Sequence, residues 1–141
     1  MCLRTFQSTP KVADKDIICY KILRKKEHKE FIPTDYTYHS IFFKQNELWP
    51  LNKVCTSRLI YDRETGNVHD AFHSFKKLTD AQMEAKCFPD VVIAKFLMPD
   101  TVVAKCIIPE NARYYEGVNA SMGATDGYAS DKIKIVEIIE A

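Results

Sequence analysis

Two β-branched apolar runs most constrain what this chain can fold into. Residues 90–117 have the sequence DVVIAKFLMPDTVVAKCIIPENARYYEG, in which the runs VVIAKFLMP and VVAKCIIP are similar to each other. Valine and isoleucine favour the pleated surface of a strand, and neither run approaches the ~20 residues needed to cross a bilayer. The runs therefore predict interior strands of a sheet. Pro99 lies between them and does not suit the turns of a tight hairpin, because its φ is fixed at a negative value.

Several further segments predict strands. Residues 16–24, DIICYKILR, carry apolar side chains on both faces, which is typical of a strand well inside a sheet. Residues 57–61 and 68–75 predict the arms of a hairpin around Gly66 and Asn67, which adopt positive φ readily. The end of the chain, residues 132–140, predicts an edge-like or one-sided strand because lysines alternate with isoleucines.

A capping box predicts one short helix. Thr79 is placed to cap the helix start, and Gln82 to bond back to the Thr79 amide. Leu78 and Met83 stand where a hydrophobic staple would form, and Pro89 ends the segment after about two turns.

The predicted architecture is one α+β domain over residues 1–141. It consists mostly of antiparallel sheet, with one or two short helices packed on a face, and 141 residues suffice to bury a core. Residues 1–15 are polar and aperiodic, which predicts a tail or strap. Residues 117–127 contain small residues and glycines, which predicts a mobile loop.

Composition narrows the class of protein. The net charge of +1 provides no global attraction for nucleic acid or an acidic membrane, so the partner we expect is a protein. The local exception is the basic run Arg24-Lys25-Lys26, whose simplest interpretation is a solvated turn. The five cysteines show no CxxC spacing, and no signal peptide or membrane span is predicted. We expect a cytoplasmic protein with no cofactor.

The histidines suggest little metal chemistry. His69 and His73 are four residues apart, but the strand-like pattern VHDAFHSF would separate them by about 13 Å, too far to share one ion. We therefore predict no metal site. Either histidine remains a weak catalytic candidate beside Asp70.

Nucleophile and nucleotide signatures are missing. The chain has no GxGxxG, GxxxxGK[ST], HExxH or GxSxG motif. Cys106 lies in a buried-looking run and is expected to be inert, whereas Cys55 has the most accessible setting among the thiols.

The segment PENARYYEG is the sharpest local signal. Arg113 offers a planar donor for a carboxylate or phosphate, and Tyr114 and Tyr115 can stack on a base or a peptide plane. Glu116 could orient a hydroxyl or act as a base. The alternative is a structural corner, in which one tyrosine packs on the core and Arg113 pairs with Glu110 or Glu116.

Several phrases carry a resemblance to other proteins. At MCLRTFQSTPKVADKDIICYKIL, and at VVAKCIIPENARYYEG followed by YASDKIKI, the chain resembles small proteins of unknown function from gut-bacterial mobile elements and prophages. A weaker likeness is to ADP-ribosyltransferase-type folds, which gather a first-strand Arg or His, a middle strand and a late Glu around NAD. GNVHDAFHSF is similar to that middle element, whereas Tyr20-Lys21 stands where Arg or His would be expected.

Three functions follow as hypotheses. The first is a non-enzymatic binding or regulatory accessory protein of a mobile element, with Arg113, Tyr114 and Tyr115 as its contact surface. The second is a nucleotide-binding transferase that uses His69 or His73 with a tyrosine and either Glu116 or Glu110. The third is a nucleic-acid-binding module acting through residues 24–29, a partner that the charge balance makes the least expected.

Overall fold

The computed structural model describes residues 3–26, 30–33, 51–87, 101–119 and 124–139. These residues form a predominantly antiparallel sheet with one described helix, which confirms the predicted α+β class. The N-terminal strands are β1 (Leu3–Arg4), β2 (Lys11–Val12), β3 (Ile17–Lys26) and β4 (Glu30–Pro33). They are followed by β5 (Val54–Thr56), β6 (Ile60–Asp62), β7 (Asn67–His69), β8 (Phe72–Phe75) and helix α2 (Leu78–Cys87). The C-terminal strands are β9 (Thr101–Ile108), β10 (Arg113–Asn119), β11 (Thr125–Ser130) and β12 (Lys132–Ile139).

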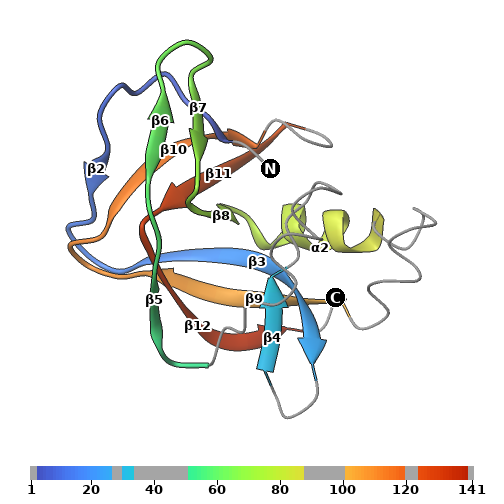
Figure 1. Cartoon of the computed structure of the whole chain (residues 1–141). Coiled ribbons are helices and arrows are strands. Elements are labelled where there is room, and N and C mark those ends of the chain that lie inside the picture. The colour runs from blue at the N-terminus through green and yellow to red at the C-terminus, as the bar shows by residue number, and fades with distance from the viewer. Residues whose placement is uncertain (1–2, 27–29, 34–50, 88–100, 120–123, 140–141) are drawn as a thin grey trace.

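The sheet curls round on itself into a half-barrel. Its strand order is β5-β12-β9-β3-β8-β11-β10-β1-β7-β6, with β2 added to β10 and β4 to β3. The two ends of this path, β5 and β6, are consecutive in the chain and are joined by residues 57–59. A connection this short spans at most ~14 Å, so the ends of the sheet must come together. Figure 1 shows β5 and β6 running as one ribbon from β12 to β7.

The strands predicted from apolar content lie where the patterns placed them. β3 is flanked by β9 and β8, and its register with β9 runs from Ile17–Ile108 to Arg24–Thr101. β6 and β7 form a hairpin where one was predicted, but the second arm, predicted as residues 68–75, pairs with β6 only as far as His69. Residues 72–75 form β8, which pairs with β11 and β3 instead. β12 is one-sided as expected, but it is no edge, because β5 pairs along it. The run VVIAKFLMP lies outside the described residues.

Two apolar cores lie on opposite faces of the β10–β11 hairpin. The main core takes Tyr128 and Tyr114 from this hairpin and buries residues of β3, β8, β9 and β12. The second core takes Tyr115 and Ala129, which are register partners, and adds side chains from β1, β6 and β7. Alternation along a strand sends neighbouring residues to opposite faces, so Tyr114 and Tyr115 belong to different cores.

Helix α2 packs on β3, β8 and β9 through its buried small residues Ala81 and Ala85. It begins two residues earlier than the predicted cap at Thr79 implies, because the Lys77 carbonyl already accepts the Ala81 amide at 3.3 Å. The predicted hydrophobic staple is not formed, since Met83 is 66% exposed.

Two segments differ from the expected tail and loop. Residues 1–15 include β1 and β2, both paired with β10, so the described part of this segment is a strap on the sheet. Residues 117–119 continue β10, and residues 125–127 belong to β11, where a mobile loop was predicted. The glycines there serve close packing: a Cβ on Gly117 would lie 2.1 Å from the Arg4 carbonyl oxygen. Residues 120–123 lie outside the described residues.

Membrane crossing by a helix finds no support in the described part of the chain. Its helix, α2, is ten residues long and lacks the length and apolar content for a span.

Candidate binding site

An irregular strap crosses β10 beside Glu116. Arg4 of β1 pairs with Val118, and Lys11 of β2 pairs with Tyr114, so six strap residues (5–10) face only three residues of β10 (115–117). Six residues cannot pair with three in a regular ladder, so the excess must bulge away from the sheet. We call residues 5–10 the strap.

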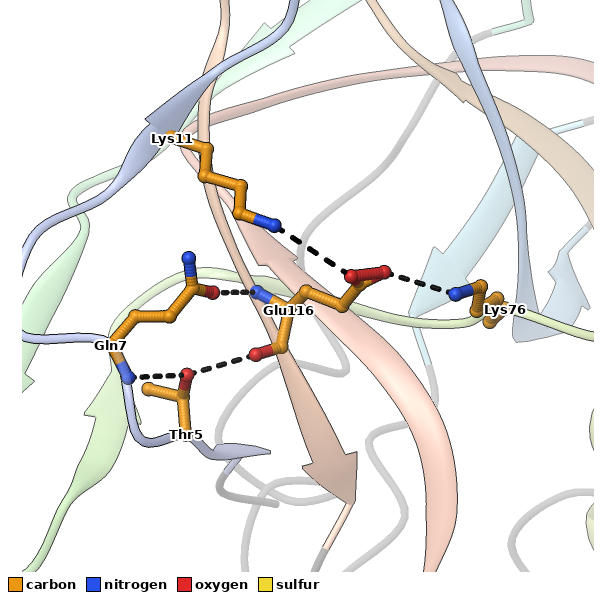
Figure 2. Close-up of polar contacts among 5 residues, drawn as sticks. All are labelled: Thr5, Gln7, Lys11, Lys76 and Glu116. Atoms are coloured by element: carbon orange, nitrogen blue, oxygen red, sulfur yellow. Dashed lines mark hydrogen bonds and ion pairs between the residues drawn. The ribbon is translucent and has the colours of Figure 1, made fainter.

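Side chains of the strap replace the missing strand pairing. The Thr5 hydroxyl donates to the Glu116 carbonyl at 2.8 Å, and the Glu116 amide donates to Gln7 Oε1 at 3.0 Å (Figure 2). The main-chain amide of Gln7 donates to Thr5 Oγ1 at 3.2 Å, and the main-chain amide of Thr5 donates to the Gly66 carbonyl at 3.0 Å. Both main-chain polar groups of Glu116 are therefore satisfied, and the start of the strap is held in one conformation.

The Glu116 carboxylate lies between two lysines. Lys76 Nζ is 3.0 Å from Oε1, and Lys11 Nζ is 3.9 Å from Oε2 (Figure 2). The hydrogen bond and the charge of Glu116 raise the pKa of Lys76. The glutamate side chain is 34% exposed, so solvent weakens the attraction, and this cluster positions the strap more than it stabilises the fold.

Two tyrosines adjoin the same face. Tyr114 and Tyr128 meet edge to face, with ring centroids 5.9 Å apart and planes at 76°. Burial raises the pKa of both phenols, and the nearby Glu116 carboxylate adds to the effect. Both hydroxyls therefore remain protonated at neutral pH, where they can donate or accept hydrogen bonds.

The expected contact surface of Arg113, Tyr114 and Tyr115 is not formed as one patch. Tyr115 is 4% exposed and stacks on Tyr61, with centroids 5.6 Å apart. Arg113 is exposed, and its Nε donates to Asp131 Oδ2 at 3.4 Å. The alternative interpretation, a structural corner, correctly predicted that one tyrosine packs on the core. Its predicted partner for Arg113 was Glu110 or Glu116, whereas the structure pairs Arg113 with Asp131.

The histidines lie on different strands and have different surroundings. His69 of β7 is partly exposed, and its Nε2 is 3.9 Å from Asp62 Oδ2. His73 of β8 is 5% exposed. Among the described residues, no three His, Cys, Asp or Glu side chains are grouped so that they could hold a metal ion.

A buried lysine was not identified from the sequence. Lys21 is 2% exposed, and its Nζ donates to the His73 carbonyl at 2.6 Å. The described pairing of β3 with β8 is confined to Tyr20 and Phe75. The Lys21 ammonium therefore donates to a carbonyl of β8 that lies beyond the described β3–β8 pairing. A lysine inside an apolar strand pattern was the available signal.

Two of the three thiols in the described part of the chain are buried rather than reactive. Cys19 and Cys106 are register partners in β3 and β9, and both are fully buried. Burial raises the pKa of Cys19 to about 12 and raises the pKa of Cys106 as well. Cys55 is partly exposed, as its sequence setting indicated.

The strap carries the apolar residue that sequence reasoning missed. Phe6 is completely exposed (101%), and Val12, two residues beyond the strap in β2, is 60% exposed. The signal was a lone aromatic residue in the polar segment 1–15.

Comparison of the chain with protein-family models, curated proteins and solved structures found no match.

Proposed function

We propose that this chain is a non-enzymatic binding protein, a cytoplasmic accessory protein of a bacterial mobile element, and that the strap is its contact surface. One observation carries the proposal: Phe6 is completely exposed on a bulge whose neighbouring residues, Thr5 and Gln7, are hydrogen-bonded to Glu116. The resemblance to proteins of mobile elements agrees with an accessory role.

A single exposed apolar side chain is ordinary on a protein surface. Phe6 is different because a held backbone presents it, so little conformational entropy would be lost when a partner encloses the ring. Burial of a phenylalanine side chain contributes roughly 1.5–3 kcal/mol, and aromatic anchors of this kind dominate many interfaces.

The ionisable groups beside the strap support binding rather than catalysis. The pKa of Lys76 is raised, which keeps the ammonium protonated, whereas a nucleophilic lysine needs a lowered pKa. The raised pKa values of Tyr114 and Tyr128 likewise oppose their use as bases. These groups suit fixed hydrogen bonds and charges at an interface.

Photo-crosslinking from position 6 tests this proposal. Phe6 would be replaced by p-benzoylphenylalanine in the bacterium that carries the gene, and the cells irradiated. We expect a discrete covalent adduct with one partner protein, because the benzophenone reacts with groups that enclose it. The same substitution at Met83, which is 66% exposed on α2, is the matched control and should give no such adduct.

A companion variant separates binding from folding. Phe6→Ala should change the free energy of unfolding by less than about 0.5 kcal/mol, since the ring makes no buried contact. Added in excess, purified Phe6→Ala protein should compete with the crosslink more weakly than wild type. Identical adducts from positions 6 and 83, or no adduct from position 6, would contradict the assignment of the strap.

A further inference from the structure

A second surface lies on the open face of four neighbouring strands, far from the strap in the strand order. A row of side chains crosses β3, β9, β12 and β5. Ile18 pairs with Ile107, Ile107 with Lys134, and Lys134 with Val54. Ile18 is 50% exposed and Val54 is 45% exposed. Three strand spacings of ~4.8 Å give the row a width of about 14 Å.

The opposite face of the same strands is the main core. Cys19, Cys106 and Ile133 alternate with the residues of the row, and all three are fully buried. The row must therefore point away from the core. Helix α2 packs on β3 and β9, and Ile22 and Val103, which are register partners further along this face, are fully buried. The face is closed at that end and open at the row.

Charge on this open face is predominantly positive. Lys105 lies between Tyr20 and Glu137 in register, and Lys132 lies opposite Thr56. Among the described strand residues of this face there are, with Lys134, three lysines and one glutamate, whereas the whole chain carries a net charge of only +1. Lys132 and Lys134 are two residues apart on one strand, so their Cβ atoms project about 7 Å apart on the same side.

We propose that this open face binds an acidic, extended segment of a partner protein that presents apolar side chains between its carboxylates. The lysines select for negative charge, and the exposed isoleucine and valine side chains select for apolar contacts within reach of it. Both kinds of contact occur in one row only 14 Å wide, roughly the length of four or five extended residues.

Two other occupants fit less well. A second copy of the chain would bring the lysines of one face against those of the other, and like charges across an interface repel. Single-stranded nucleic acid would match the lysines, but it binds through aromatic platforms, and the residues described on this face supply one aromatic ring, Tyr20. The apolar row favours a polypeptide.

A designed peptide tests the proposal. The probe is a fluorescein-labelled 13-residue peptide in which every second residue is serine and the others alternate valine and glutamate, so that one face carries both. Fluorescence anisotropy at low salt should show saturable binding to the wild type. The lysine-for-glutamate peptide should bind at least tenfold more weakly, and a labelled oligothymidylate should bind more weakly than the acidic peptide.

Variants locate the peptide on the face. Lys134→Glu and Ile18→Ser should each weaken binding of the acidic peptide by about tenfold, because they reverse the central charge and remove an exposed apolar contact. Arg63→Glu, in the turn between β6 and β7, makes the same change of charge off this face and should leave the affinity unchanged.

Several results would overturn the proposal. They are the absence of saturable binding by the wild type, equal affinities for wild type and Lys134→Glu, or tighter binding of the oligothymidylate than of the peptide. A wild-type dimer in sedimentation that Lys134→Glu dissociates would assign the face to self-association instead. Circular dichroism of each variant confirms that a loss of binding does not reflect unfolding.

Discussion

At the scale of single residues, the buried polar side chains of this protein differ in whether they find a hydrogen-bond partner. Lys21 and Glu84 are both buried, yet their settings differ: the lysine ammonium donates to the His73 carbonyl, whereas Glu84 lies on α2, which packs on the sheet. Among the residues that the structure describes, no hydrogen-bond donor reaches Glu84 Oε2. Burial, with a smaller contribution from Asp80, raises the pKa of Glu84 to about 6.

This raised pKa predicts a pH-dependent effect of Glu84→Gln. Since the pKa is higher in the folded than in the unfolded chain, the protonated form stabilises the fold below the ordinary value of 4.5. That stability is lost as the pH rises through 6, at a cost of up to about 2 kcal/mol. At pH 7.5, the free energy of unfolding of Glu84→Gln, measured by urea denaturation, should therefore exceed that of the wild type by about 1–2 kcal/mol.

The comparison across pH gives the test its control. Below pH 4.5, wild type and Glu84→Gln should unfold with equal free energies, because the carboxyl is then neutral in both states. Glu64→Gln, at an exposed turn position, should show no difference at either pH. A Glu84→Gln variant that is no more stable than wild type at pH 7.5 would show that the carboxyl is not strained by burial.

At the scale of elements, the β10–β11 hairpin organises the fold. Its two faces serve two different cores, so alternation along a single strand divides Tyr114 from Tyr115. The N-terminal strap lies along the other edge of β10, where Gly117 lets the main chain of Arg4 and Thr5 approach. The glycine expected to make a loop mobile instead permits a close contact between elements.

Gly117→Ala should therefore be strongly destabilising. An added Cβ would lie 2.1 Å from the Arg4 carbonyl oxygen and 3.2 Å from the Thr5 Cα, so the strap would have to move off β10. Overpacking of this kind typically costs about 1–3 kcal/mol, and the loss of strap hydrogen bonds adds to that. Chemical denaturation measures the change.

Val118→Ala is the neighbouring control, because its side chain is 37% exposed and its loss should cost well under 1 kcal/mol. Equal stabilities of Gly117→Ala and Val118→Ala would mean that the strap does not depend on this close approach.

At the scale of the whole molecule, Asp131 joins the parts of the curled sheet. It is the single residue between β11 and β12, and its carboxylate accepts the Arg113 amide at 3.0 Å. Its carbonyl accepts the Ser57 amide at 2.7 Å, which fixes the β5–β6 connection to the same corner. The ends of the strand path are thereby held together, and β3 and β9 lie in the middle of that path.

Thiol labelling reports whether the central strands β3 and β9 are protected from solvent. In the native protein, iodoacetamide should modify Cys55 and leave Cys19 and Cys106 protected, because both are buried and burial raises their pKa values. Their modification should require global unfolding, since opening one edge of the sheet does not expose central strands. Peptide mapping by mass spectrometry assigns each site.

The labelling has an internal reference in denaturant. In 8 M urea the three thiols should react at similar rates, so any native difference reports protection by the fold. Native labelling of Cys19 or Cys106 as fast as Cys55 would show that β3 and β9 open locally.

Local patterns predicted several of the strands and the class of fold. β-branched apolar runs determined β3 and β9, turn chemistry determined the β6–β7 hairpin, and one-sided alternation determined the buried face of β12. The Leu78–Met83 staple failed because a helix on a sheet turns its small residues inward, and packing rather than capping decides that orientation.

What only the tertiary structure decided was which faces meet. Sequence period assigns side chains to alternate sides of a strand, but it does not say that both sides of β10 are covered, nor that six residues of strap must cross three of β10. Those facts come from pairing between segments more than a hundred residues apart, such as Arg4 with Val118. They placed Tyr115 in a core and left Phe6 in solvent, because a side chain's surroundings depend on distant strands that local pattern does not encode.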